Sequence, residues 1–267
     1  MRTRLLLLFA LVIVGGAMPP TALAAGTTVI RGTYDNGYES FVGLYPIPMR
    51  HGMTIGELAR LFNEHFGIGA DLDVIPMQGW TRSMYHDEAG APWVMPSPNM
   101  PTLDTAIVYP GTVLFEGTNV SEGRGTTRPF ELVGAPWVTD EGFADALNAR
   151  NLSGVHFRPT VFEPTIHKHA KSTCGGVQIH VTDRQVFKPA ITGIAVVKTA
   201  FDMYRDDFRW KDPPYEYEYD RNPFDLIAGT DKVRMAIESG MSVQGIEQSW
   251  EPALAEFDRL RSQFLLY

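Results

Sequence analysis

The chain has 267 residues, of which 44% are hydrophobic and 20% are charged, as in an ordinary soluble protein. Its formal net charge of −8 argues against nucleic acids and anionic membranes as partners, because both would repel its surface. Cys174 is the only cysteine, so the chain can form no internal disulfide.

The N-terminus has the three-part layout of a secretory signal peptide. A basic start is followed by an apolar run over Leu5 to Val14, and then by small residues that end in Ala22-Leu23-Ala24. The apolar run is shorter than the roughly 20 residues that span a bilayer, which favours cleavage after Ala24 over a membrane anchor. We therefore expect a secreted or periplasmic protein with no membrane association after cleavage. Residues 25–40 read as a linker or as the remnant of an N-terminal lobe.

The first predicted elements follow this linker. Phe41 to Pro48 is a candidate short strand. Thr54 and Glu57 match a capping box, and Ile55, Leu58, Leu61 and Phe62 share one face of a helix that reaches about Phe66. The alternation over Leu72 to Met77 is interrupted by a proline, which predicts an edge strand.

Strands and helices are mixed through the rest of the chain. The predicted strands are Phe130–Trp137, Val155–Phe162 and Val177–Val181. The predicted helices are Thr102–Val108, Thr139–Asn148, Lys188–Tyr204, Asp225–Leu226, Lys232–Ser239 and Ile246–Phe264, the last being the longest. Gly111–Phe115 is either a helix or a strand. Because strands and helices do not alternate strictly, the expected class is α+β, or mixed α/β.

The stretch from Pro96 to Thr127 is rich in glycine and proline and carries convergent polar side chains, as binding loops do. Within it, Glu116 and Glu122 are a candidate catalytic carboxylate pair, since glycoside hydrolysis uses two carboxyl groups. The plainer interpretation is that one carboxylate anchors Arg124. The turn around Arg124 either binds an anion or is a structural glycine turn. Nearby tryptophans either stack on sugars or belong to the core.

His167, His169, Cys174 and His180 are the most metal-like group in the chain. Imidazole and thiolate suit zinc, but the spacing of these four residues matches no standard zinc site. We therefore expect no metal and no cofactor.

Five segments carry a resemblance to a known family. They read SFVGLYPIPMRHGMTIGELA, GWTRSM, WVMPSPNMPTLDTAIVYPG, LFEGTNVSEGRGTTRPFELVGAPW and CGGVQIHVTDR. They closely resemble the exo-β-N-acetylmuramidase NamZ family over about Tyr38 to Tyr267. The resemblance implies that residues 41–267 form the C-terminal lobe of a two-lobed glycosidase. It also implies an exported enzyme of cell-wall turnover that removes N-acetylmuramic acid from the non-reducing end of peptidoglycan fragments.

The resemblance also suggests roles for individual residues. Glu116 and Glu122 would be catalytic, and the lactyl carboxylate of the sugar gives Arg124 or Arg50 a partner. The expected substrate-binding residues are Arg50, His51, Trp80, Asn99, Thr102, Asn119, Arg124 and Thr126.

One departure from the family pattern leaves three hypotheses open. Family members carry a Gly-Pro-Glu-His-Gly motif, with the proposed catalytic acid, in a Rossmann-like half before the segment that matches here, and this chain has no such motif. The chain is then a working hydrolase that uses Glu116 or Glu122, a catalytically inactive module that binds muramyl sugars or peptidoglycan ends, or a fragment whose N-terminal lobe lies elsewhere.

Overall fold

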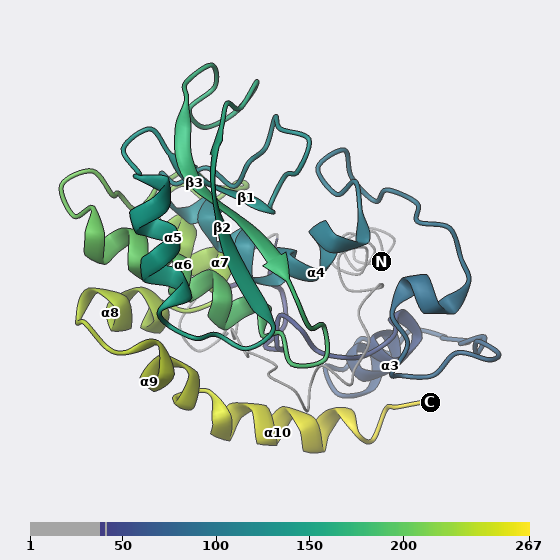
Figure 1. The fold of residues 1–267 in the computed structure, drawn as a ribbon. Coiled ribbons are helices and arrows are strands. Elements are labelled where there is room, and N and C mark those ends of the chain that lie inside the picture. Colours follow the sequence, from purple (N-terminus) through teal and green to yellow (C-terminus); the bar gives the residue numbers. More distant parts are fainter. Residues whose placement is uncertain (1–37, 41) are drawn as a thin grey trace.

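The computed structural model describes residues 38–40 and 42–267. The predicted signal peptide and most of the predicted linker lie outside these residues. Within them the fold is mixed α/β, as predicted, with a small antiparallel sheet and helices packed around it (Figure 1). The strands are β1 (Leu132–Ala135), β2 (Val155–Phe162) and β3 (Cys174–Val181), in the order β1-β3-β2.

The central strand β3 begins three residues earlier than the predicted strand because of its glycines. Gly176 pairs with Gly134 on β1, and a Cβ added to Gly176 would lie 2.0 Å from the carbonyl oxygen of Val133. Only glycine fits such a close approach between strands. Further along β3, Val177 and Ile179 are buried, whereas Gln178 and His180 lie on the other, more exposed face.

The helices differ from the predictions mainly near the C-terminus. They are α3 (Ile55–Glu64), α4 (Leu103–Thr112), α5 (Asp140–Asn148), α6 (Pro189–Met203), α7 (Pro223–Ala228), α8 (Lys232–Glu238), α9 (Val243–Gln248) and α10 (Glu251–Arg261), with 3-10 helices η2 (His86–Ala89) and η3 (Val113–Gly117). The prediction of one long helix over Ile246–Phe264 is wrong, because the chain starts a new helix at Glu251 with a proline in its first turn. The longest described helix is α6, with 15 residues.

The N-terminal predictions had mixed outcomes. The capping box is confirmed, since the Thr54 backbone N–H donates to Glu57 Oε2 at 2.7 Å and the Glu57 N–H donates to Thr54 Oγ1. The strand over Leu72–Met77 is wrong, because this segment has no strand partner and Ile75 is 89% exposed. The described part of Phe41–Pro48 forms only an isolated bridge between Ser40 and Gly43.

Helix α4 extends past the predicted end at Val108 because of its contact with α6. A Cβ added to Gly111 would lie 1.9 Å from the carbonyl oxygen of Pro189, so the two helices meet backbone to backbone. This close packing carries α4 through Pro110 and directly into η3. Segment Gly111–Phe115, which the sequence left as helix or strand, is therefore helical.

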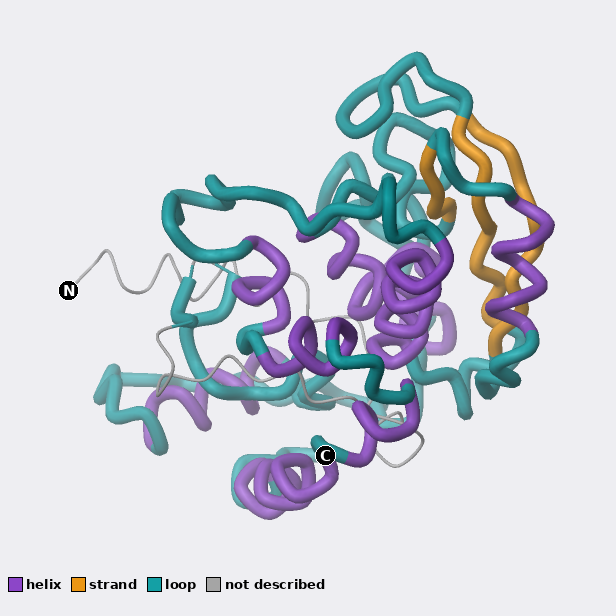
Figure 2. Tube along the Cα trace, turned by 90° about the vertical axis from the view of Figure 1, so that its left-hand side faces the viewer, coloured by secondary structure: helices purple, strands orange, loops and turns teal. Residues whose placement is uncertain are grey.

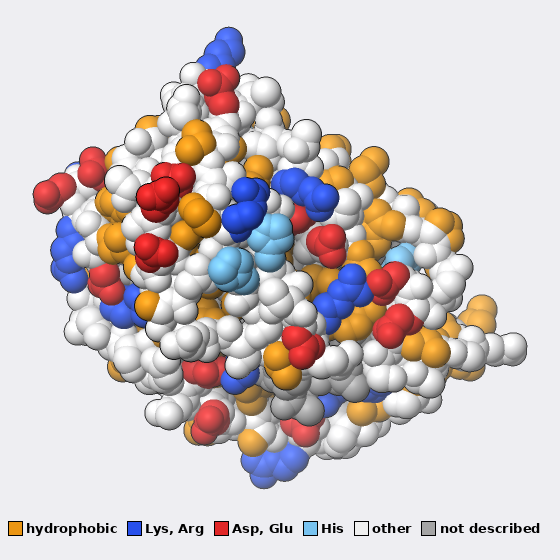
Figure 3. All heavy atoms as spheres, viewed as in Figure 1, with side chains coloured by type: hydrophobic (Ala, Val, Ile, Leu, Met, Phe, Trp, Pro, Cys, Tyr) orange, Lys and Arg blue, Asp and Glu red, His pale blue; other side chains and the backbone are white. Residues whose placement is uncertain are grey.

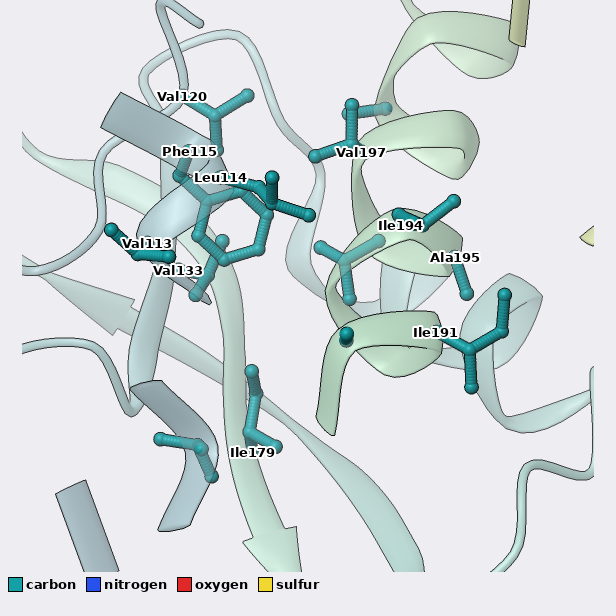
Figure 4. Close-up of a cluster of buried hydrophobic side chains, with 14 of the residues drawn as sticks. Val113, Leu114, Phe115, Val120, Val133, Ile179, Ile191, Ile194, Ala195 and Val197 are labelled. Carbon is teal, nitrogen blue, oxygen red and sulfur yellow. The ribbon is translucent and has the colours of Figure 1, made fainter. Parts of the chain in front are cut away.

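The core has two parts. The larger one joins the sheet, α4, η3 and α6, and Figure 4 shows Phe115, Val133 and Ile179 facing Ile191 and Ile194 of α6. The smaller one packs α3 against α10 and the C-terminal segment through Leu61, Phe62, Phe257 and Phe264. Figure 2 shows the strands together at one side of the molecule and α10 at another. None of the helices in the described residues is both long and apolar enough to cross a membrane.

Candidate active site

Three residues of the stretch predicted to form the site meet Lys168 from a later loop in a largely inaccessible group of four charges, which we call the ion-pair cluster: Glu116, Glu122, Arg124 and Lys168. The Arg124 guanidinium contacts Glu116 Oε1 through Nη2, and its Nε lies 3.3 Å from Glu122 Oε1. Lys168 Nζ lies 2.8 Å from Glu122 Oε2. Two carboxylates thus meet two cations, and the charges of the cluster cancel.

Local backbone geometry assembles this cluster. Glu116 comes from η3, and Glu122 and Arg124 come from the glycine turn that follows. Gly125 has a φ of +81°, and a Cβ there would lie 2.6 Å from the backbone nitrogen of Ile166. The turn therefore lies directly against the loop between β2 and β3, from which Lys168 enters the cluster. Lys168 Nζ also donates to the carbonyl oxygens of Phe115 and Val120 at 2.6 and 3.0 Å.

Burial and ion pairing act in opposite directions on the two cations. Burial lowers the pKa of Lys168, although the neighbouring Glu122 carboxylate opposes this effect. Burial also disfavours the charge on Arg124, but attraction by Glu116 and Glu122 outweighs it and raises the pKa of Arg124. The Tyr215 hydroxyl donates to Glu116 Oε2 at 3.0 Å, and burial together with this carboxylate raises the pKa of Tyr215. Each member of the cluster is therefore held by the others.

Two predicted binding residues in the same stretch hold loops together. The Asn119 side chain donates to the Asp207 carbonyl at 2.8 Å and accepts from the Arg209 backbone N–H at 2.9 Å. Thr126 Oγ1 donates to the Gly123 carbonyl at 2.6 Å. A substrate would have to compete with these contacts, and the binding roles of Asn119 and Thr126 stay predictions.

The buried Glu131 directly precedes β1, and its carboxyl group contacts the start of α4. Its Oε1 accepts from Thr105 Oγ1 at 2.8 Å and from Thr102 Oγ1 at 3.5 Å, and its Oε2 from Arg128 Nη1 at 3.2 Å. Burial raises the pKa of Glu131, although Thr105 and Arg128 oppose this effect. Thr102, predicted to bind substrate, is the N-cap of α4. Our sequence reasoning missed Glu131, although it lies within one of the segments that carry the family resemblance.

Beside Glu131, the outer face of β2 and β3 is polar. His156 and His180 are directly opposite each other across the two strands, as are Arg158 and Gln178. Burial, with Arg158 and His156 nearby, lowers the pKa of His180. Figure 3 shows histidines beside basic and acidic side chains on this face of the molecule. Asn99, another predicted binding residue, is half-buried in the loop before α4.

Arg50 lies elsewhere and is a buried cation with few partners. It is 4% exposed, and its Nη1 donates to the Phe187 carbonyl at 3.4 Å, the long end of hydrogen-bond distances. Its Nε and Nη2 have no hydrogen-bond partner among the described residues. Burial lowers the pKa of Arg50, with Tyr85 opposing.

His51 and Trp80 contact the C-terminal part of the chain. The buried His51 accepts at Nδ1 from the Met53 backbone N–H at 3.1 Å. Burial and then the charge of Arg261 lower the pKa of His51 to about 4. Trp80 packs edge-on against Tyr267 with ring centroids 5.2 Å apart. Of the predicted binding residues, Arg124 therefore contacts Glu116 and Glu122 directly, whereas Arg50, His51, Trp80 and Thr102 have other partners.

The metal-like residues are also separated in their contacts. His169 Nε2 lies 2.7 Å from the Asn119 carbonyl oxygen, Cys174 is buried at the start of β3, and His180 lies near its end. Burial raises the pKa of Cys174 to about 11. Among the described residues, no three His, Cys, Asp or Glu side chains are grouped so that they could hold a metal ion.

Comparisons with known proteins agree with the resemblance seen in the motifs. Residues 22–104 match the N-terminal domain of exo-β-N-acetylmuramidase NamZ, and residues 107–267 match its C-terminal domain. The chain is 49% identical over 230 residues to the peptidoglycan β-N-acetylmuramidase NamZ of Bacillus subtilis. This alignment covers 86% of the chain and 54% of the relative, so the chain spans about half the length of that protein.

Solved structures support the same relationship. A DUF1343 family protein of Bacteroides fragilis superposes with a TM-score of 0.79 at 28% identity, covering 95% of this chain and 64% of that one. A second protein of the same family and organism gives a TM-score of 0.68 at 28% identity, with coverages of 94% and 65%. Since the C-terminal domain match alone accounts for more than half of the sequence, the chain belongs to the NamZ exo-β-N-acetylmuramidase family.

Proposed function

We propose that this chain is a glycoside hydrolase that acts on peptidoglycan fragments and removes N-acetylmuramic acid from their non-reducing ends. The observation that carries the proposal is the 49% identity to a peptidoglycan β-N-acetylmuramidase over 230 residues. No cofactor is needed, since glycoside hydrolysis requires one carboxyl group that donates a proton and one that is ionised.

The contacts suggest different roles for the carboxyl groups. Glu116 and Glu122 are ion-paired, which suits an ionised nucleophile or base better than a proton donor. Glu116 is the more accessible of the two, with a side chain that is 16% exposed against 4% for Glu122. Glu131 suits the proton donor, because burial raises its pKa and two of its partners are neutral hydroxyls.

Release of a chromogenic group from its β-glycoside with N-acetylmuramic acid tests this proposal. We expect the wild-type chain to release the group, and Glu116→Gln and Glu131→Gln to lower kcat at least a hundredfold. Glu64→Gln is the matched control, because Glu64 is an exposed carboxyl of α3 whose partner is Arg60. Thermal unfolding of each variant separates lost catalysis from lost folding. Absence of both release and sugar binding by the folded wild type would contradict the proposal.

A second candidate function is binding without catalysis. It is favoured by the ion-pair cluster, in which every carboxylate is already occupied, and by the chain's coverage of about half of its relative. Retained binding of muramyl sugars with no release, and with no effect of Glu116→Gln, would support this function. Release restored by adding a separate NamZ N-terminal lobe would instead identify that lobe as a partner.

We also propose export, on the basis of the signal-like residues 1–24. Mass spectrometry of the protein from its host should find a mature N-terminus at Ala25, and an intact Met1 in the exported protein would contradict cleavage. The domain boundary at residue 41 stays a prediction. The family matches meet instead between residues 104 and 107.

A further inference from the structure

Arg50 is the most unusual charged group in the described part of the chain. An arginine that is 96% buried normally has a carboxylate beside it, because an unpaired buried charge costs several kcal/mol. No ion pair of Arg50 occurs within the described residues, and two of its three nitrogens lack a hydrogen-bond acceptor. An anion bound beside Arg50 would supply the missing acceptor.

Besides its interaction with Tyr85, Arg50 makes a backbone contact that places its guanidinium beside the N-terminus of α6. Its acceptor, the Phe187 carbonyl, lies two residues before Pro189, where α6 begins. The N-cap residue Lys188 makes no capping hydrogen bond with its side chain, which instead pairs with Glu247. The first turn of α6 is fully buried, so its free N–H groups, at Ala190 and Ile191, are shielded from water.

The Arg50 guanidinium and the N-terminus of α6 both carry positive charge. The N-terminus of a helix carries partial positive charge and favours anions. A guanidinium beside an uncapped N-terminus increases the local positive charge instead of neutralising it. The hydroxyl of Thr192, also in the first turn of α6, is buried and has no partner either. A carboxylate would accept hydrogen bonds from donors of this kind.

The comparison with Arg124 decides between the two arginines that could bind the carboxylate of a sugar. Arg124 already has Glu116 and Glu122 as partners. Arg50 has no carboxylate partner among the described residues. An incoming carboxylate would therefore compete with two protein carboxylates at Arg124, whereas at Arg50 it would satisfy an unmet need.

We propose that Arg50 and the N-terminus of α6 form the site that binds the lactyl carboxylate of N-acetylmuramic acid. The identity of the sugar rests on the proposed function. Arg50 is then the residue that distinguishes N-acetylmuramic acid from N-acetylglucosamine, which lacks this carboxylate.

Calorimetric titration of both free sugars into the full chain tests this site. We expect wild type to bind N-acetylmuramic acid at least tenfold more tightly than N-acetylglucosamine. Arg50→Met should abolish this preference by weakening only the first sugar, and Arg50→Lys should keep part of it. Arg259→Met is the matched control, because Arg259 is an exposed arginine of α10 that contacts the Ala255 carbonyl, and it should keep the full preference.

A third ligand, lactate, separates failure of this inference from failure of the proposed function. Lactate carries the carboxylate without the sugar ring, and it should raise the melting temperature of wild type but not of Arg50→Met. Hydrolysis of the muramyl glycoside with an unchanged sugar preference in Arg50→Met would overturn the inference alone. Protection by lactate without recognition of either sugar would keep the anion site and overturn its assignment to N-acetylmuramic acid. No effect of lactate or of either sugar would overturn both.

Discussion

The ion-pair cluster and the surroundings of Arg50 differ in how their charges are paired. The charges of the cluster have partners of opposite charge, whereas Arg50 has none among the described residues. In the cluster, two carboxylates and two cations meet at hydrogen-bonding distances, and Tyr215 and two backbone carbonyls occupy further positions around them. Around Arg50 the described residues supply one long hydrogen bond to a carbonyl, although Arg50 is only 4% exposed and the Arg124 side chain is 22% exposed.

The difference in charge pairing suggests a structural role for the ion-pair cluster and a ligand-binding role for Arg50. In a cluster with matched charges every charged group has a partner without a ligand. Removing one member leaves its partner as an unpaired buried charge, which destabilises the fold. A buried charge without a protein partner is neutralised only when a ligand of opposite charge binds. On this account the cluster holds the site together, and Arg50 provides its affinity for an anion.

The largest expected effect comes from breaking the cluster. Arg124→Met leaves Glu116 without its cation and Glu122 with Lys168 alone, and it should lower the free energy of unfolding by about 3 kcal/mol. Urea denaturation checks this value. Arg158→Met, at the surface, should change it by less than about 0.5 kcal/mol. Equal stabilities of the two variants would show that the cluster is not needed for folding.

Acid should add a second unmatched charge beside Arg50. His51 has its pKa lowered to about 4 by burial and by Arg261, whereas in the unfolded chain its pKa is about 6.5, so the unfolded state binds the proton first as the pH falls. Stability should therefore decrease from about pH 6.5 to about pH 4, by about 3 kcal/mol in total.

His51→Asn isolates this contribution, because an asparagine oxygen can accept the Met53 N–H in place of Nδ1. The variant should lose about 3 kcal/mol less than wild type over this pH range. Parallel stability curves for the two proteins would exclude His51 as a source of acid sensitivity.

A smaller loss of stability is expected when a neutral hydrogen-bond donor to the Glu131 carboxyl group is removed. Thr105→Val removes the 2.8 Å hydrogen bond to Glu131 and leaves a buried oxygen partly unsatisfied, which should cost about 2 kcal/mol. Thr112→Val, at another buried threonine of α4 that bonds only to the Val108 carbonyl, should cost less than about 1 kcal/mol. Thermal unfolding in parallel would show whether the two threonines differ.

Local signals predicted much of the fold. The capping box at Thr54 depends on neighbours in sequence, and α3 forms as expected. The strand predicted over Val155–Phe162 also forms, as β2. Signals that depend on distant partners failed. Leu72–Met77 has a strand-like pattern but no strand to pair with. The predicted long helix ran through Pro252, where the chain instead starts the separate helix α10.

In the candidate site, too, contacts between residues close in sequence were predictable, and contacts with distant residues were not. Glu116, Glu122 and Arg124 are close in sequence, and their convergence follows from the glycine turn between them. Lys168 and Tyr215 approach the cluster from loops more than 40 residues away, and no spacing in the sequence indicates them. The unmatched state of Arg50 is likewise a property of what surrounds it in space.

The most direct test of this account is the stability of Arg50→Met with and without N-acetylmuramic acid. Without the sugar, the variant should be at least as stable as wild type, because it removes a buried charge that has no carboxylate partner among the described residues. With the sugar in excess, wild type should gain stability and Arg50→Met should not. A loss of 3 kcal/mol or more in the absence of sugar, together with an equal gain for both proteins in its presence, would contradict the account.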